Sequence, residues 1–354
     1  MCYEEELSED SPWFVTMAIT IYITFVAIGT LAVFVFLAVL IKGNSTFKQF
    51  PFFTIVWHLT IVNTISIFLQ GSCIVPSLFF DFEDGDWWNT WYTWGRKTVQ
   101  LSETACALLV FLIAINRFSV FVVKPLAIAF SRENIKYPLA ITWACIIGMA
   151  YLRLFQMPLV TKFTRKKFEF SDLLLAKEGP VYIFVVTTSY VIPSAIFFMY
   201  LIIYMYLRKT RPSIHVVNDE NSRNDKSLLL QGFSLALGIM LWRTLTTITP
   251  RVQSCFGMDF LLTMLKSMAE VINNILNPLL FLIFNSTVRN ILKQLIFCKS
   301  DVPKVVSDSD IPTARPTNKV RGKMRKLLTK KPKIEPLVVL STMEQVETNM
   351  PKVA

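Results

Sequence analysis

Long apolar segments alternate with short polar ones along most of this chain. Seven segments have enough consecutive apolar residues to cross a bilayer as helices, which takes about 20 residues. They lie at residues 13–41, 52–80, 98–123, 137–159, 180–207, 228–250 and 259–284. A spanning segment must satisfy its own backbone hydrogen bonds, so each is predicted to be an α-helix. The pattern therefore predicts an all-α membrane protein, a seven-transmembrane helix bundle.

The composition agrees with a membrane protein and disfavours other classes. Hydrophobic residues make up 53% of the chain and charged residues only 17%, against about 25% charged in soluble proteins. The six cysteines are scattered without a CxxC pair, and there are two histidines. We therefore expect no metal, no cofactor and no redox site. Paired catalytic carboxylates, a nucleophile motif and a phosphate loop are all missing, so an enzyme is not expected, and the basic residues do not indicate nucleic acid.

Charge asymmetry predicts the orientation of the bundle. Residues 1–12 are acidic and contain no Lys or Arg, whereas Lys42 and Lys48 follow the first span. Since cytoplasmic loops are enriched in basic residues, the N-terminus is predicted to be extracellular. The stretch 161–168, TKFTRKKF, is the main exception to this rule. Seven spans then place residues 299–354, a basic tail predicted to be disordered, in the cytoplasm.

Two polar residues interrupt the third span. Residues 112–123, LIAINRFSVFVV, contain Asn116 and Arg117. From the start of this span, 20 residues at about 1.5 Å each place Arg117 at the inner boundary of the bilayer. A long cationic side chain can simply reach the interface there. The alternative is that Arg117 has a function, as intramembrane charges often do.

The seventh span and the segment after it contain two further features. Asn277-Pro278 frees a backbone carbonyl within the span, which predicts either a static kink or a bend that can repack. Residues 285–298 follow, and their apolar positions fall on one face of a helix. This predicts an amphipathic helix along the inner membrane surface. Cys298, just after it, is a candidate acylation site.

Together these residues resemble the rhodopsin-like G-protein-coupled receptors. Asn116-Arg117-Phe118 stands for that family's Asp-Arg-Tyr, and Asn277-Pro278-Leu279-Leu280-Phe281 for its Asn-Pro-x-x-Tyr. Asn63 takes the place of the family's sodium-site aspartate, while the fourth and fifth spans contain the expected Trp143 and Pro193. The resemblance covers about residues 13–298. It implies a plasma-membrane receptor that binds an external small molecule and activates an intracellular heterotrimeric G protein.

The departures from the family pattern narrow the comparison. The usual disulfide between the third span and the second outer loop has no cysteines to form it, and the sixth span lacks Cys-Trp-x-Pro. Trp242 stands near that tryptophan, and Pro250 lies at the outer end. Loose motifs of this kind are similar to the nematode serpentine chemoreceptors, of the class gamma or class v group. That resemblance implies sensory transduction in the membrane of a sensory neuron.

Polar residues in the outer halves of the spans are the candidate ligand site, because buried charges in a membrane are costly. They form a slightly cationic set that would suit a small polar or acidic molecule: Gln100, Glu103, Arg153, Gln156, Trp242, Arg243, Lys266 and Glu270. The structural alternative is pairing within the set. Lys266 and Glu270 are four residues apart and could pair along one helix face, and Glu103 could pair with Arg243.

On the inner side, Arg117 is expected to contact the fifth and sixth helices or a G protein, and the loop 208–226 to complete the docking surface. In the tail, residues 319–333 contain eight basic residues. They predict attraction to anionic lipids, with a calmodulin target as the alternative. Because Asn116 is neutral, its bond to Arg117 is expected to be weaker than that of an aspartate. This predicts raised basal signalling or a substitute restraint elsewhere. The sequence is also compatible with a receptor dimer.

Two other membrane functions fit part of the pattern. A seven-span ligand-gated channel or transporter would have the opposite orientation and no use for Arg117, although internal repeats common in transporters are not apparent. A retinal protein needs a lysine in the seventh span. Lys266 lies eleven residues before Asn277. In visual-pigment-like receptors the retinal-binding lysine occupies the position that Val271 has here, so Lys266 does not match it.

Overall fold

The computed structural model describes most of the apolar part of the chain. The described residues are 12–80, 87–156, 159–164, 169–174, 179–210, 230–241, 244–245 and 259–297. The chain divides into two units, Met1–Ser300 and Asp301–Ala354, and all described residues belong to the first. The predicted tail and Cys298 therefore lie outside the described residues, as do residues 211–226 of the predicted loop 208–226.

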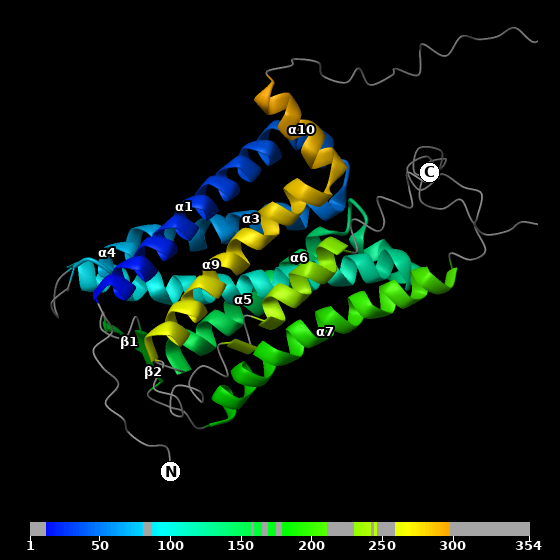
Figure 1. The fold of residues 1–354 in the computed structure, drawn as a ribbon. Coiled ribbons are helices and arrows are strands. Elements are labelled where there is room, and N and C mark those ends of the chain that lie inside the picture. Colours follow the sequence, from blue (N-terminus) through cyan, green and yellow to red (C-terminus); the bar gives the residue numbers. More distant parts are fainter. Residues whose placement is uncertain are drawn as a thin grey trace, which may run out of the picture. The chain divides into compact units, whose positions relative to one another are not determined.

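Long helices account for most of the described residues (Figure 1). They are α1 (Pro12–Lys42), α3 (Pro51–Leu69), α5 (Trp87–Phe121), α6 (Lys136–Tyr151), α7 (Pro180–Thr210) and α9 (Asp259–Phe284). Short helices α2 (Asn44–Phe47), α4 (Val75–Ser77) and α10 (Ser286–Ile296) lie beside them. The turns η1 (Gln70–Ile74) and η3 (Leu152–Gln156) are π-helical, and η2 (Lys124–Phe130) is a 3₁₀-helix.

Six of the helices, extended by their adjoining turns, are long and apolar enough to cross a membrane. They correspond to the first five predicted spans and the seventh. Within the sixth predicted span, 228–250, the described residues form a shorter apolar helix, Leu230–Leu241. The chain is thus an integral, multi-pass helical membrane protein, with six candidate spans in its described part and a shorter apolar helix within the predicted sixth span.

Helix α5 is the centre of the packing. It contacts α3, α6 and α7, while α1 packs against α3 and α9 (Figure 1). Close contact between α1 and α9 depends on Gly29, because a Cβ atom there would lie 2.6 Å from the Ile275 side chain. Small residues allow membrane helices to approach in this way. The glycine therefore sets the distance between the first and last spans.

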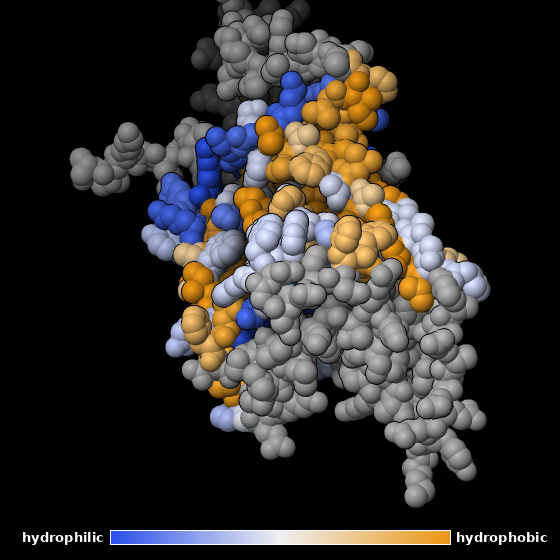
Figure 2. Space-filling view, turned by 90° about the vertical axis from the view of Figure 1, so that its left-hand side faces the viewer, coloured by the Kyte–Doolittle hydropathy of each residue, from blue (hydrophilic) through white to orange (hydrophobic). Residues whose placement is uncertain are grey.

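Buried apolar side chains form two main clusters. The larger joins α1, α3, α5, α7, helix Leu230–Leu241 and α9, and includes Phe36, Leu59, Leu109, Ile203 and Phe281. The second lies between α1, the end of α3 and the first half of α9, and includes Tyr22, Ile67 and Met268. Other large apolar side chains, such as Leu31, Ile147 and Phe198, are more than half exposed. Figure 2 shows that hydrophobic side chains cover much of the coloured surface on the face it presents, as expected for a surface in lipid.

The all-α bundle is accompanied by one two-stranded antiparallel hairpin, which the hydropathy pattern did not predict. Strands β1 (Leu159–Thr164) and β2 (Glu169–Leu174) pair with Leu159 opposite Leu174 and Thr164 opposite Glu169. The fourth span accordingly ends earlier than predicted, because its α-helix stops at Tyr151 and η3 at Gln156. An apolar run alone does not separate the end of a helix from the start of a strand, and the hydropathy pattern merged the two.

The third span begins eleven residues before its predicted start, at Trp87 rather than at residue 98. Its 35 residues make a helix of about 52 Å, longer than the hydrocarbon core of about 30 Å. The added turns contain the exposed side chains of Trp87, Trp88, Trp91 and Trp94. Tryptophan is enriched at membrane interfaces, which explains a helix that continues past its most apolar part.

Candidate functional site

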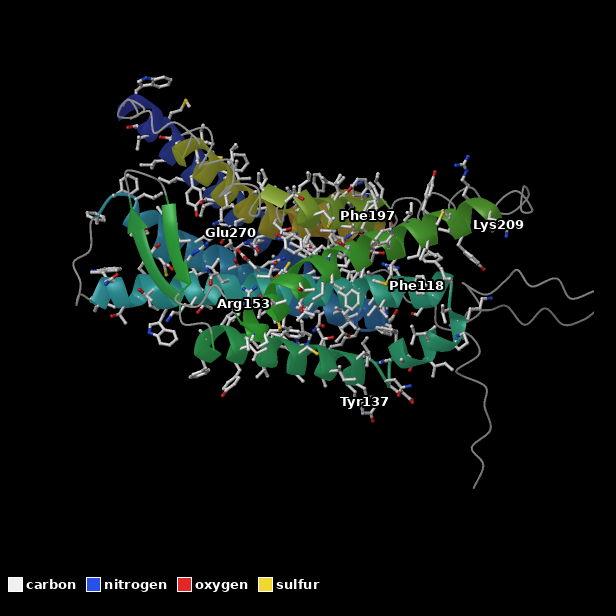
Figure 3. All side chains as sticks on the ribbon, turned by 90° about the horizontal axis from the view of Figure 1, so that it is seen from below. Phe118, Tyr137, Arg153, Phe197, Lys209 and Glu270 are labelled. Atoms are coloured by element: carbon white, nitrogen blue, oxygen red, sulfur yellow. The ribbon has the colours of Figure 1, made fainter. Side chains whose placement is uncertain are left out.

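The polar residues singled out from the sequence gather at two separated places in the bundle. Figure 3 shows Glu270 and Arg153 toward one end, with the β-hairpin, and Phe118 and Lys209 toward the other. We call these the Arg96 end and the Arg117 end, after two residues of α5. Since the two arginines are 21 positions apart on one helix, they lie about 30 Å apart along its axis.

At the Arg96 end, a buried ion pair joins α5 to α9. Nη1 of Arg96 lies 2.8 Å from Oε1 and 3.0 Å from Oε2 of Glu270. The amide Nε2 of Gln70 donates a third hydrogen bond to Glu270 Oε1, at 3.2 Å. Arg96, Glu270 and Gln70 are 3%, 5% and 1% exposed. Because both charges are removed from solvent, each depends on the other for compensation.

The local backbone explains how Gln70 reaches this pair. It is the first residue of the π-helical turn η1, which continues α3 toward Pro76. π-helical turns are rare and frequently occur at functional sites. The second such turn, η3, contains Arg153 at the corresponding end of α6. Both turns thus place a polar side chain next to α5.

The alternative pairing of Lys266 with Glu270 is not the ion pair that the structure shows. Lys266 is one helical turn before Glu270 on α9, but the carboxylate binds Arg96 on α5. Arg96 was not a predicted site residue, because it lies in the part of α5 that the hydropathy pattern left outside the third span. A buried residue such as Glu270 gains more from a buried partner than from the half-buried Lys266, since less competing water surrounds the pair.

Two other predicted ligand residues are close together. Nη1 of Arg153 donates to the backbone carbonyl of Gln100 at 3.4 Å, which joins the end of α6 to α5. Glu103, one turn further along α5, is buried at 8% exposure. The side chains of Gln156, Trp242 and Arg243 lie outside the described residues, and so does the predicted pair of Glu103 with Arg243.

A small hollow between α5, α6 and α7 does not contain any of the predicted ligand residues. It is lined by Thr104, Ala107, Leu108, Met149, Thr188, Ser189, Ile192 and Pro193. The hydroxyls of Thr104, Thr188 and Ser189 all donate to carbonyls of their own helices. Its wall is therefore apolar in character.

A buried polar layer lies between the two ends. Nδ2 of Asn274 donates to Ser66 Oγ at 2.9 Å, and Nδ2 of Asn277 lies 3.5 Å from the Cys106 sulfur. Asn63 is 1% exposed, and neither of its side-chain polar atoms has a hydrogen-bond partner in the structure. Side chains from α3, α5 and α9 therefore meet here.

Helix α9 presents these polar groups as one stripe. Its buried polar residues are Ser267, Glu270, Asn273, Asn274 and Asn277. Spacings of three and four residues place them on one face of a helix. The stripe runs from the ion pair with Arg96 to the turn that contains Pro278. One helix thus connects the Arg96 end with the residues before Phe281.

At the Arg117 end, aromatic rings connect the two motifs. The Arg117 guanidinium lies over the Phe52 ring, 4.0 Å from its centroid. Phe52 contacts Phe281 at 5.9 Å between centroids, and Phe281 stacks on Phe36 at 5.4 Å. The arginine of Asn116-Arg117-Phe118 is therefore linked to the last residue of Asn277-Pro278-Leu279-Leu280-Phe281 through one phenylalanine of α3. Sequence reasoning missed Phe52, because nothing local marks a phenylalanine in an apolar run as an arginine contact.

The neighbours of Arg117 belong to three helices. Asn116 is buried, and its carbonyl accepts a hydrogen bond from Ser119 Oγ at 2.6 Å. Tyr200 of α7 is buried and near enough to Arg117 for an electrostatic interaction. The ring of Tyr200 lies directly against Gly232 of helix Leu230–Leu241, where a methyl group would overlap it. The fifth helix therefore comes near Arg117 through Tyr200.

The predicted amphipathic helix is present as α10. Asn285 caps it, because its Oδ1 accepts from the Val288 amide at 3.1 Å. Val288 and Ile291 are buried, and α10 packs against α1. A Cβ atom at Gly43 would lie 2.5 Å from Ile291, so this glycine permits the contact. Figure 1 shows α10 across the end of α1.

The chemistry available to these groups is hydrogen bonding and charge pairing. Among the described residues, no three His, Cys, Asp or Glu side chains come together in a way that could hold a metal ion. No model of a known protein family matches the chain, and no curated protein matches it by sequence.

Proposed function

We propose that this protein is a rhodopsin-like G-protein-coupled receptor of the chemosensory type, similar to the nematode serpentine receptors. The observation that carries the proposal is that residues of its two diagnostic motifs contact one and the same side chain. Arg117 and Phe281 both contact the ring of Phe52, although α5 and α9 supply them from distant parts of the chain. A conformational change in either motif would therefore alter the packing around the other.

The Arg117 end is the proposed G-protein face. Arg117 is half-buried beside Tyr200, and helix Leu230–Leu241 rests on that tyrosine through Gly232. Outward movement of this helix would uncover the guanidinium for a partner. The amphipathic α10 borders the same end, where its exposed Ile296 and Phe297 can enter the lipid interface. The proposal requires this end to be cytoplasmic.

The Arg96 end is the proposed ligand face. Its polar groups are the pair Arg96 and Glu270, the amide of Gln70, and the Arg153 guanidinium bonded to Gln100. We therefore add Arg96 and Gln70 to the residues expected from the sequence. The guanidinium groups of Arg96 and Arg153 lie at this end together with the carboxylates of Glu270 and Glu103. A small polar or acidic ligand would compete with Glu270 for Arg96 or with the Gln100 carbonyl for Arg153.

Helix α9 supports communication between the two ends. Its buried polar stripe begins at the ion pair and ends at the Pro278 turn, directly before the Phe281 ring. A ligand that binds one packing of α9 better than another would shift the population of that packing. The receptor itself would make and break no bonds, and nucleotide exchange would occur on its partner.

The rest of the proposal concerns the membrane. The N-terminus would be outside, the basic residues 319–333 would bind anionic lipids of the inner leaflet, and Cys298 would be the acylated residue. The protein would lie in the plasma membrane of a sensory neuron, where it could also form receptor dimers.

Topology and basal exchange test this proposal together. Epitope tags at each terminus of the full chain are probed on intact cells, and membranes are then mixed with purified heterotrimers of each Gα class. We expect an accessible N-terminus and agonist-independent nucleotide exchange on one heterotrimer, lost in the matched variant Arg117→Gln. An accessible C-terminus would overturn the proposal in favour of a channel or transporter of inverted topology. No Arg117-dependent exchange on any class would overturn it as well.

A further inference from the structure

The Arg117 guanidinium lies on the face of an aromatic ring in the first turn of α3. The distance from its central carbon to the Phe52 centroid is 4.0 Å, within the range of about 6 Å over which a ring face attracts a cation. Phe52 directly follows Pro51, the first residue of the helix. Proline at this position fixes the start of the helix, and it thereby fixes the backbone position of Phe52, the next residue.

The helix end itself would not attract this arginine. The N-terminus of a helix bears a partial positive charge, so a cation near the first turn of α3 is disfavoured. The negative face of the Phe52 ring offsets this and gives the guanidinium a defined position. A leucine of similar volume would fill the space without that attraction.

The ring is itself held in place. Phe52 contacts Phe281 at 5.9 Å and Phe53 edge-on at 5.5 Å, and Phe53 stacks on Phe47 at 4.1 Å. Phe281 and Phe47 are each 1% exposed. Because its neighbours already fix the Phe52 ring, binding of the cation has little further ring motion to restrict. The ring therefore offers the Arg117 guanidinium a fixed surface to bind.

We propose that Phe52 is a positioning residue for Arg117, whose ring holds the guanidinium against α3 and thereby restrains coupling to a G protein. Asn116, the neutral residue beside Arg117, cannot form the charge pair that an acid would form there, and Phe52 supplies a restraint from another helix. This inference rests on the proposed function for its consequence, but the contact itself can be tested without a G protein.

The contact is tested with a double-mutant cycle on the full chain in lipid nanodiscs. Midpoints of thermal unfolding are measured for Phe52→Leu, Arg117→Gln and the double variant. We expect Phe52→Leu to lower the midpoint by about 2–4 °C with Arg117 present, and by less in the Arg117→Gln background. Phe52→Tyr keeps a ring face and should retain the coupling. Equal shifts in both backgrounds would overturn the proposal.

Phe53→Leu is the matched control for this cycle. Phe53 is adjacent in sequence and stacks on Phe47, and it meets Phe52 only edge-on. The cost of Phe53→Leu should therefore depend on Arg117 less than the cost of Phe52→Leu does. If Phe53→Leu shows the same dependence on Arg117 as Phe52→Leu, the effect is general to the start of α3 and the positioning role is overturned.

The effect of Phe52 on coupling is measured as basal nucleotide exchange on the G protein. Release of Arg117 in Phe52→Leu should raise agonist-independent exchange about two- to tenfold, and Phe52→Tyr should stay near the parent level. Lowered exchange in Phe52→Leu would overturn the restraint. Coupling in the thermal cycle without exchange on any heterotrimer would leave the contact supported and the receptor proposal refuted, so the two failures are distinguishable.

Discussion

Arg96 binds both carboxylate oxygens of Glu270 through a single nitrogen, at 2.8 and 3.0 Å, across 174 positions of sequence. Both side chains are almost fully buried, and Gln70 adds a further donor to the same carboxylate. The pair joins α5 to α9 at the end of the bundle where the ligand is proposed to bind. It therefore links the two helices at that end through a buried polar contact.

Neutralising one member of this pair should be costly. Glu270→Gln leaves the Arg96 charge buried without its carboxylate, so the free energy of unfolding should fall by about 3–5 kcal/mol. The double variant Arg96→Gln/Glu270→Gln should lose less than the two single variants combined, because neither member of the pair is left buried without its partner. Thermal unfolding in nanodiscs measures both. Lys266→Gln is the control, and a loss as large as that of Glu270→Gln would show that Lys266 is a true partner.

The buried amides of the middle layer should respond in opposite directions. Asn63 has no hydrogen-bond partner in the structure, so Asn63→Leu should stabilise the bundle by about 1 kcal/mol, by removing an unsatisfied polar group. Asn274→Leu breaks the bond to Ser66 and should cost about 1 kcal/mol. The two variants have the same change in composition and a similar position in the membrane. Destabilisation by both would mean that Asn63 makes a polar interaction of its own.

The positions of the spans could largely be predicted from the sequence, because lipid imposes uniform apolarity on a helix. The seventh span, predicted at 259–284, is α9, Asp259–Phe284, and the first, predicted at 13–41, is α1, Pro12–Lys42. The start of α5 could not be predicted in the same way. Its first turns contain tryptophans and polar residues that suit the interface, and hydropathy does not distinguish these from a loop.

Contacts between helices were the part that sequence reasoning missed. Glu270 was recognised as a buried charge, but its partner could be chosen only from residues on the same helix, where spacing is known. Arg96 and Phe52 become neighbours of Glu270 and Arg117 through packing that brings distant segments together. Such pairings depend on the rotation of whole helices, which hydrophobic pattern alone does not determine.

The contact of Tyr200 with helix Leu230–Leu241 depends on Gly232. A methyl group there would overlap the tyrosine ring, so Gly232→Ala should lower the free energy of unfolding by about 1–3 kcal/mol through overpacking. In a Tyr200→Leu background the added cost should be smaller. Gly148→Ala is the matched control, because a Cβ atom there would meet nothing within 4 Å, and helix propensity should make it neutral or stabilising by up to about 1 kcal/mol. Equal effects at both glycines would contradict the proposed close contact.

Restoring an acid beside Arg117 should strengthen the resting state. Asn116 is buried next to the arginine, and a charge-assisted hydrogen bond is roughly twice as strong as a neutral one. A gain of about 1 kcal/mol would lower basal nucleotide exchange about fivefold in Asn116→Asp. The measurement is agonist-independent exchange at matched surface expression. In the Arg117→Gln background the same substitution should have no such effect, because the cation that the aspartate would hold is gone. Unchanged exchange with normal expression would mean that the resting state is held elsewhere, and Phe52 would then be the first residue to examine.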